Sequence, residues 1–248
     1  MAANPVHTAP RPAVTTAHRS PSSLDYYLVL PRRDDPDPPS GVAGLVVEEF
    51  TREHDHVSTG LDSAGWTPAA GWWSSAALSR SIRTDPDTSA RMVPTSRVEA
   101  EGHYRTLGGG HLPDDTELRS YFLVHQPIPT AAPLRLGPAQ PPAGWHERRV
   151  YRVLFAKDLR PDQVTSLRAS WRTPVDATGA SAASGHLEKG GDRFDWELRR
   201  VAHTRAWALD VTVLLVAAAD GAVGSTLSDL TTVLRQHGLI PVTTERFS

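Results

Sequence analysis

The chain has 248 residues, enough for one large domain or two domains of ordinary size, and either can bury a hydrophobic core. Its formal net charge of -2 gives no general attraction to nucleic acid or to an anionic membrane. It contains no cysteine, which excludes disulfides, thiolate nucleophiles, zinc ribbons and iron–sulfur clusters.

Residues 1–23 have no acidic side chain, four prolines and no apolar pattern, which is typical of a disordered tail. Leu24–Pro31 and Val42–Phe50 are short and apolar, and each predicts a strand. Thr51–Trp66 has a weaker pattern, for which we predict a short helix. With three further helices before residue 125, residues 24–125 are expected to form a mixed α/β subdomain.

Glu53-His54-Asp55-His56 is the densest group of potential metal ligands in the chain. On a strand, His54 and His56 would point the same way and could chelate a divalent ion with Glu48 or Glu49. We expect instead a solvated turn over Glu53–His56, because no third ligand has a supporting spacing. The sequence therefore predicts no metal site, and we assign no cofactor.

Three helices are predicted before residue 125. Ser74–Arg83 has a serine to cap its start and an apolar face. A capping box, Ser96-Arg97-Val98-Glu99, opens a second helix that runs to Leu107 and is stopped by Gly108–Gly110. Asp114 is predicted to cap a third helix over Asp115–Val124.

Polar side chains gather where the second of these helices meets the third. Glu101, His103 and His111 lie close in sequence, and a histidine beside a carboxylate can act as a general base. These three residues are our catalytic candidates. The alternative is an ordinary helix junction, in which such side chains serve as caps and solvated charges.

Seven tryptophans are many for a chain of this length. Trp72 and Trp73 follow Gly71 at the entrance of a predicted helix, where an apolar ring with one donor could line a groove. With Tyr104, they are our candidates for binding a ligand. Packing in the core is the alternative.

Residues 126–145 form a proline-rich connector, and the boundary between two subdomains is placed there. From residue 146 to 248 the predicted elements follow the order β-α-β-β-α-β, which is the ferredoxin-like order. The six elements are Tyr151–Ala156, Pro161–Trp171, Arg193–Val201, Ala206–Ala217, Ala222–His237 and Leu239–Phe247.

The composition of these strands agrees with an antiparallel sheet in the order 4-1-3-2 with both helices on one face. Val150–Ala156 and Ala206–Ala217 are apolar on nearly both faces, as central strands are, whereas Arg193–Val201 alternates and Leu239–Phe247 contains Pro241, as edge strands do. Thr173–Gly191 is predicted to be a mobile loop.

Because both faces of Ala206–Ala217 carry large apolar side chains, we expect the sheet face away from the helices to need a cover. The N-terminal subdomain, through its Tyr26–Leu30 strand, is favoured as that cover, and a homodimer is the alternative. Arg148, Arg149 and Tyr151, with Arg199, Arg200 and Trp207, could instead stack RNA bases on this face, but RNA-binding motifs are not matched and we expect no nucleic-acid partner.

The overall prediction is an α+β protein in which a smaller mixed α/β subdomain precedes a ferredoxin-like unit. No membrane span or secretory leader is recognisable, so we expect a soluble, cytoplasmic protein. Only two of the 26 basic side chains are lysines, Lys157 and Lys189, which indicates a GC-rich bacterial genome.

Known catalytic and nucleotide-binding motifs are absent from the sequence. The leading functional hypothesis is a non-catalytic binding or assembly module that uses a sheet face or a groove between subdomains. Its partner would be a protein or a small molecule. The alternative is a small cofactor-independent enzyme with histidine and carboxylate acid–base chemistry in a pocket between the subdomains.

Overall fold

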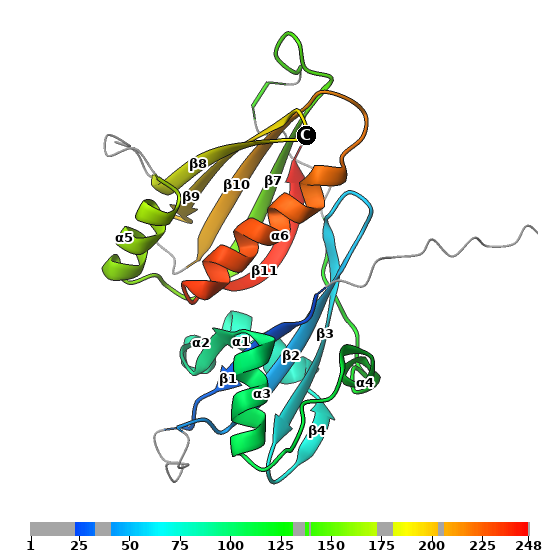
Figure 1. Cartoon of the computed structure of the whole chain (residues 1–248), viewed down its shortest axis with the longest axis vertical. Helices are drawn as coiled ribbons and strands as arrows, with labels where there is room; N and C mark the ends of the chain where they lie inside the picture. The colour runs from blue at the N-terminus through cyan, green and yellow to red at the C-terminus, as the bar shows by residue number, and fades with distance from the viewer. Residues whose placement is uncertain are drawn as a thin grey trace, which may run out of the picture.

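The computed structural model describes residues 23–32, 41–130, 137–138, 140–172, 181–202 and 206–247. They form two antiparallel sheets with helices packed against them, so the α+β class is confirmed. The N-terminal and C-terminal sheets lie one beyond the other along the long axis of the molecule (Figure 1). Apart from Ser23, the predicted disordered tail lies outside the described residues.

The N-terminal sheet has the order β4-β3-β2-β1-β5, and β6 also pairs with β3. Two of its strands confirm predictions, but the helix predicted over Thr51–Trp66 is wrong, because this segment pairs with β2 from Leu45↔Trp66 to Arg52↔Ser58. The strands are β1 (Asp25–Val29), β2 (Gly44–Arg52), β3 (Ser58–Thr67), β4 (Gly71–Ser74), β5 (Met92–Thr95) and β6 (Gln126–Pro127).

The helices of this half are α1 (Ala76–Thr84), α2 (Pro86–Ala90), α3 (Arg97–Thr106) and α4 (Asp115–Ser120). The predicted capping box is confirmed: Ser96 Oγ accepts from Glu99 N at 3.2 Å, and Glu99 Oε2 accepts from Ser96 N at 3.0 Å. Asp114 caps α4 as predicted, but the helix ends at Ser120 and not at Val124. Helix α3 ends before Gly108, whose φ of 91° favours glycine.

Each face of the N-terminal sheet packs against different partners. On one face, α3 and α4 cover a core that includes Tyr26, Leu45, Trp66, Tyr104 and Leu118. The opposite face packs against α1 and against the C-terminal half, in a smaller cluster of Tyr27, Val46, Ile82, Met92 and Ile240. The second cluster contains residues from both halves, so it joins them.

Replacing either of two glycines of this half by alanine should change the stability, in opposite directions. A Cβ on Gly44 would lie 2.3 Å from the carbonyl oxygen of Trp66 in the paired strand. Gly44→Ala should therefore lower the free energy of unfolding by about 1–3 kcal/mol. A Cβ on Gly102, inside α3, meets nothing within 4 Å. Gly102→Ala should raise the free energy of unfolding by about 0.5–1 kcal/mol. Urea denaturation of both variants checks the pair, and equal effects would contradict it.

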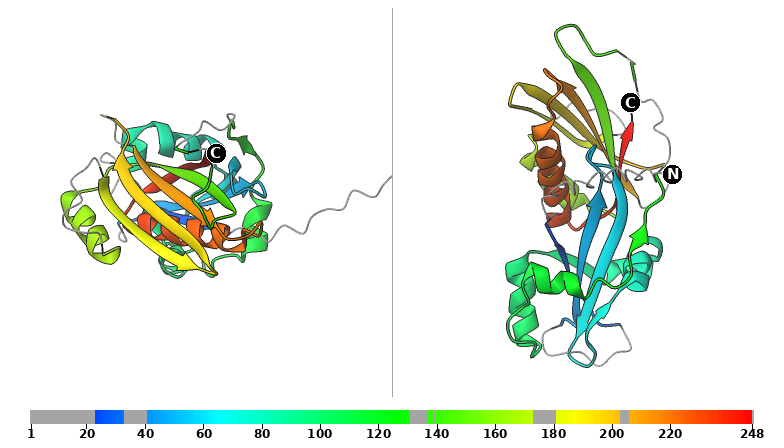
Figure 2. Two further views of the ribbon diagram at one scale, coloured as in Figure 1. Left: turned by 90° about the horizontal axis from the view of Figure 1, so that it is seen from above. Right: turned by 90° about the vertical axis from the view of Figure 1, so that its right-hand side faces the viewer.

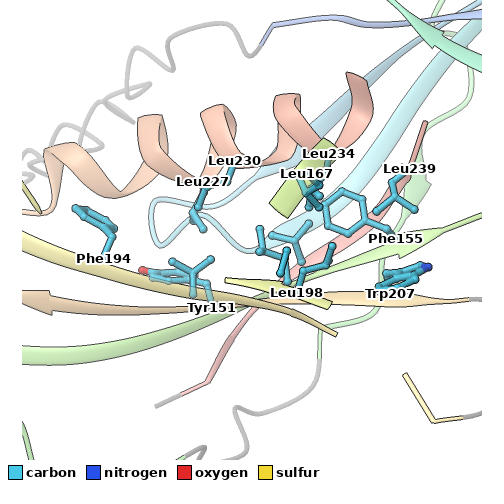
Figure 3. Close-up of a cluster of buried hydrophobic side chains, with 14 of the residues drawn as sticks. Tyr151, Phe155, Leu167, Phe194, Leu198, Trp207, Leu227, Leu230, Leu234 and Leu239 are labelled. Atoms are coloured by element: carbon cyan, nitrogen blue, oxygen red, sulfur yellow. The ribbon is translucent and has the colours of Figure 1, made fainter. Parts of the chain in front are cut away.

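The C-terminal sheet has the order β11-β7-β10-β9-β8, so the predicted order 4-1-3-2 of four strands is found in β11-β7-β10-β9. Side chains of both helices pack into one core with the strands (Figure 3), which places α5 and α6 on one face as predicted. The elements are β7 (Glu147–Ala156), α5 (Pro161–Ser170), β8 (Ser181–Lys189), β9 (Asp192–Arg200), β10 (Trp207–Leu215), α6 (Gly221–Gln236) and β11 (Ile240–Phe247).

The edge of this sheet differs from the prediction. Residues 181–189 of the predicted loop form β8, which pairs with β9 and makes β9 an internal strand. Residues 173–180 lie outside the described residues. The Trp196 ring lies over Gly185, where a Cβ would meet it at 2.6 Å. Strand β8 has few bulky residues of its own, and the Trp196 side chain of the neighbouring strand covers its backbone at Gly185.

The sheet face away from the helices is charged, so the expectation that it needs an apolar cover is wrong. Asp210 lies opposite Arg152 and accepts from it at 2.6 Å, and it accepts from Arg199 at 3.0 Å. The predicted Tyr26–Leu30 strand does not extend this sheet, since β1 lies between β2 and β5 in the other sheet. Tyr151 and Trp207 are buried on the helix side (Figure 3) and do not reach this face.

Candidate functional site

The catalytic candidates from the sequence lie on the outer surface of α3 and after it. Glu101 Oε1 accepts from Arg105 Nη2 at 2.9 Å and lies 3.5 Å from His111 Nδ1. The side chain of His111 is 90% exposed. His103 lies on α3 with Glu101 but takes no part in this contact. The structure therefore brings Glu101 and His111 together in the open, and neither lines a groove between the two halves.

The aromatic candidates form a packing cluster. Trp72 Nε1 donates to the Tyr104 hydroxyl at 3.3 Å, and its ring stacks on Tyr121 at 5.5 Å. Tyr104 is buried against Trp66 at 4.4 Å between ring centroids. Trp73 points the other way along β4, and its ring lies where a Cβ of Gly65 would be. Trp72 and Tyr104 thus hold α3 and α4 against the sheet.

Glu53–His56 lies in the turn between β2 and β3, as predicted. His56 has a φ of 68° and lies against Tyr151 of the C-terminal half, with ring centroids 6.3 Å apart. Glu48 is fully buried beside Arg83, and Glu49 pairs with Arg119 on the opposite face. The hairpin tip is therefore a contact between the halves. Strand β3 also runs beside β11 (Figure 2), where Thr244 N donates to Ser58 Oγ at 3.0 Å.

Two buried ion pairs lie between the halves. Arg83 contacts Glu48 at 2.6 Å and donates through Nε to the Pro241 carbonyl at 3.0 Å, so a charge pair of the N-terminal half holds β11. Arg235 of α6 contacts Asp25 of β1 at 2.9 Å. Asp25 and Glu48 are cross-strand neighbours. Two carboxylates and two guanidinium groups therefore alternate at this interface, which stabilises the arrangement only while all four are present.

A groove of about 630 Å³ opens beside these pairs. One wall is the end of α1 with α2, and the other is the end of β7 with β11. Most of the lining is apolar, and it includes Ile82, Leu154, Phe155 and Val242; the polar residues at the groove are Arg83, Thr84, Asp85, Ser89, Lys157 and Asp158. The groove thus exists only because the two halves meet.

Lys157 is the distinctive cation of this groove. It follows β7 with a φ of 73°, an uncommon conformation for a residue other than glycine. Its Nζ donates to the Met92 carbonyl at 2.7 Å, and among the described residues no carboxylate lies within 4 Å of it. Burial, and then the neighbouring Arg160, lower the pKa of Lys157 below its ordinary value. Lys157 also lines a smaller adjoining pocket of about 250 Å³.

Ser89 and Asp158 complete the polar side of the groove. Ser89 is 6% exposed, and its buried Oγ has no hydrogen-bond partner among the described residues. Asp158 is different, since its carboxylate accepts from Arg200 Nη2 at 2.7 Å and from Trp207 Nε1 at 3.1 Å. Among the described residues, the groove therefore has an ammonium without a counter-ion and, in its wall, a buried hydroxyl without a hydrogen-bond partner, whereas Asp158 already has two partners.

The sequence did not indicate this site. Lys157 stood out only as one of two lysines, and Ser89 carried no signal at all. Residues 82–90 and residues 154–158 come from different halves, so their meeting depends on how the halves dock. The one sequence feature that could have indicated the site is that Lys157 directly follows the predicted strand Tyr151–Ala156.

No family model, no curated protein and no solved structure matches the chain. Within the part of the chain that the structure describes, no helix is long and apolar enough to cross a membrane, and no group of three or more His, Asp or Glu could hold a metal ion. The groove itself is therefore the basis on which a function can be proposed.

Proposed function

We propose that this protein is a non-catalytic binding module whose small-molecule ligand lies in the groove between the two halves. The observation that carries the proposal is the groove of about 630 Å³, whose lining is mostly apolar with polar groups from both walls. This is the usual composition of a ligand site, in which apolar walls provide affinity and sparse polar groups fix orientation. Sites at the junction of two structural units are also common.

The groove is a better candidate than the open sheet face. On that face, Asp210 is shared by Arg152 and Arg199, so the central charges already have partners. An apolar partner would have to separate these ions from water without offering new contacts. The groove, by contrast, has an ammonium without a counter-ion and a hydroxyl without a partner among the described residues, and both can gain a contact when a ligand enters.

We also propose that the C-terminal half is a ferredoxin-like unit extended by one strand. The support is the order of its strands and the placement of both helices on one face, with β8 as the addition at the edge. In such a unit the ends of β7 and β11 are available for docking another element, and here α1 and α2 lie against them.

The enzyme alternative gains no support from the groove. Acid–base catalysis by His103 or His111 requires a histidine beside a bound substrate. Among the described residues, the lining of the groove contains no histidine. Glu101 and His111 meet on an exposed surface that would not exclude water from a reaction.

A neutral fluorescent probe tests the proposed site. N-phenylnaphthylamine brightens in apolar surroundings, and we expect it to bind the wild-type protein with one site per chain. Ala90 is exposed and lines the groove, so Ala90→Trp should fill part of the site and weaken probe binding by about tenfold or more. The matched control is Ala77→Trp, because Ala77 is equally exposed on α1 but does not line the groove.

The control variant should bind the probe as the wild type does. Equal binding by all three proteins, or no binding by the wild type, would show that the groove is not the ligand site. Thermal unfolding of both variants confirms that the added indole leaves the fold intact.

A further inference from the structure

We infer that the groove binds a small amphipathic monoanion, with an apolar body on the Leu154 and Val242 side and one carboxylate held by Lys157 and Ser89. The inference rests on the proposed function, and it adds the chemical class of the ligand. Four features of the groove support it: a cation without a counter-ion, a hydroxyl without a partner, apolar walls, and acidic side chains that limit the charge of the ligand.

Lys157 differs from the other cations around it. Arg83 has Glu48 at 2.6 Å, Arg200 has Asp158 at 2.7 Å, and Arg235 has Asp25 at 2.9 Å. The ammonium of Lys157 has only a backbone carbonyl among the described residues. A half-buried cation with no counter-ion is costly in a low-dielectric site, so an entering anion gains a partner that the protein itself does not supply.

Ser89 supplies a second donor. Its Oγ is buried without a partner in α2 among the described residues, and a buried hydroxyl that lacks a hydrogen bond is unfavourable. The carbonyl that accepts from Lys157 belongs to Met92, three residues after Ser89, so the Lys157 ammonium contacts the chain segment that follows α2. A carboxylate has two oxygens and can accept from a hydroxyl and from an ammonium at once.

Two acidic residues restrict the ligand to one negative charge. Asp85 and Asp158 also line the groove. Asp85 caps α2, and its hydrogen bonds from Thr88 hold the pKa of its carboxyl below the usual value, so it remains ionised. A dianion such as a phosphate monoester would bring its second charge near these carboxylates. A monocarboxylate satisfies Lys157 without that repulsion.

The apolar walls indicate what the rest of the ligand is. Leu154, Ala206 and Val242 are partly buried and line the groove. An alkyl chain or an aromatic ring would bury apolar surface against them, and removing that surface from water favours binding. A medium-chain fatty acid has both parts, and octanoate is the probe that we choose.

The test compares octanoate with octanol by titration calorimetry on the full chain. The two probes have the same apolar tail and differ in the charge of the head group. Wild-type protein should bind octanoate about tenfold more tightly than octanol. Lys157→Met should remove that preference, and Lys189→Met, which changes the other lysine of the chain, should keep it. Ser89→Ala should weaken octanoate binding and leave octanol binding unchanged.

A pH series adds a readout that a structural role of Lys157 would not produce. The preference for octanoate should disappear as the pH rises through the pKa of Lys157, which burial places below the ordinary lysine value. A preference that persists after Lys157→Met, in folded protein, would overturn the inference.

The comparison of ligands in the wild type needs no variant, so it stands even if Lys157→Met fails to fold. If octanol binds as tightly as octanoate and Ala90→Trp blocks both, the groove is a ligand site but the inference about its anion is wrong. If Ala90→Trp affects neither of these probes nor the neutral dye, the proposed function itself is wrong.

Discussion

Glu48→Gln should lower the free energy of unfolding by about 3–5 kcal/mol, because it removes one charge of a buried pair and leaves the other without a partner. The side chain of Glu48 is fully buried, that of Arg83 is 8% exposed, and the two are joined by two hydrogen bonds of 2.9 and 2.6 Å. Ser79 donates its hydroxyl to the same carboxylate. Burial opposes the charge of Arg83, but Glu48 outweighs it and raises the pKa of Arg83.

The adjacent residue provides the control. Glu49 points to the opposite face of β2 and pairs with Arg119, and these side chains are 16% and 28% exposed. Glu49→Gln should cost less than Glu48→Gln, since this pair is only partly buried and water screens it in part. Changing Glu48 and Arg83 together to methionine should cost less than Glu48→Gln alone, because no charge is then left unpaired. Urea denaturation measures all three, and equal costs at Glu48 and Glu49 would contradict the argument from burial.

The order of the C-terminal strands could be predicted because the composition of each strand is typical of its position in the sheet. β10 is apolar along both faces except at Asp210 and Thr212, and Pro241 excludes β11 from the interior of the sheet. Helix α3 could be placed because its capping box is a local signal, complete within Ser96–Glu99. In each case the information lay in the segment itself.

Other elements depend on neighbours that a single segment does not reveal. Ser181–Lys189 has little β propensity, and it is a strand because β9 offers it a partner and Trp196 covers Gly185. Asp210 broke an apolar run in the sequence, and only the register shows that Arg152 and Arg199 neutralise it. The charged face of the sheet could therefore not be predicted without the pairing of three strands.

The candidate site could not be predicted from the sequence for the same reason. Lys157 and Ser89 are separated in sequence by α3, α4 and the connector, and they line one groove because Arg83 and Arg235 hold the halves together. The residues chosen from the sequence were those with concentrated polar or aromatic composition. In the structure, Trp72 and Tyr104 pack α3, and Glu101 pairs with Arg105. The segments with the most polar and aromatic residues form a helix junction, whereas the groove forms where the two halves dock.

Arg235→Met should destabilise the protein by about 3–5 kcal/mol near neutral pH, and the loss should shrink in acid. Arg235 contacts Asp25 at 2.9 Å with side chains that are 12% and 17% exposed, and it donates to the Tyr26 carbonyl at 3.1 Å. Burial raises the pKa of Asp25 above its usual value, and Arg235 is the largest influence that lowers it. Removing the guanidinium should therefore raise this pKa further.

The sign of the pH dependence follows from that shift. A carboxyl whose pKa is higher in the folded than in the unfolded state favours folding at low pH, and this stability is lost as the pH rises through the folded pKa. The difference between wild type and variant should thus be large at about pH 7.5 and much smaller at about pH 4.5, where Asp25 of the variant takes up a proton. Urea denaturation at both values measures it. Adding Asp25→Asn to Arg235→Met should recover part of the stability at the higher pH, because the unpaired buried charge is gone. A loss of the same size at both values would mean that Arg235 acts through its packing on Tyr27, whose ring lies 5.2 Å from the guanidinium, and not through the charge of Asp25.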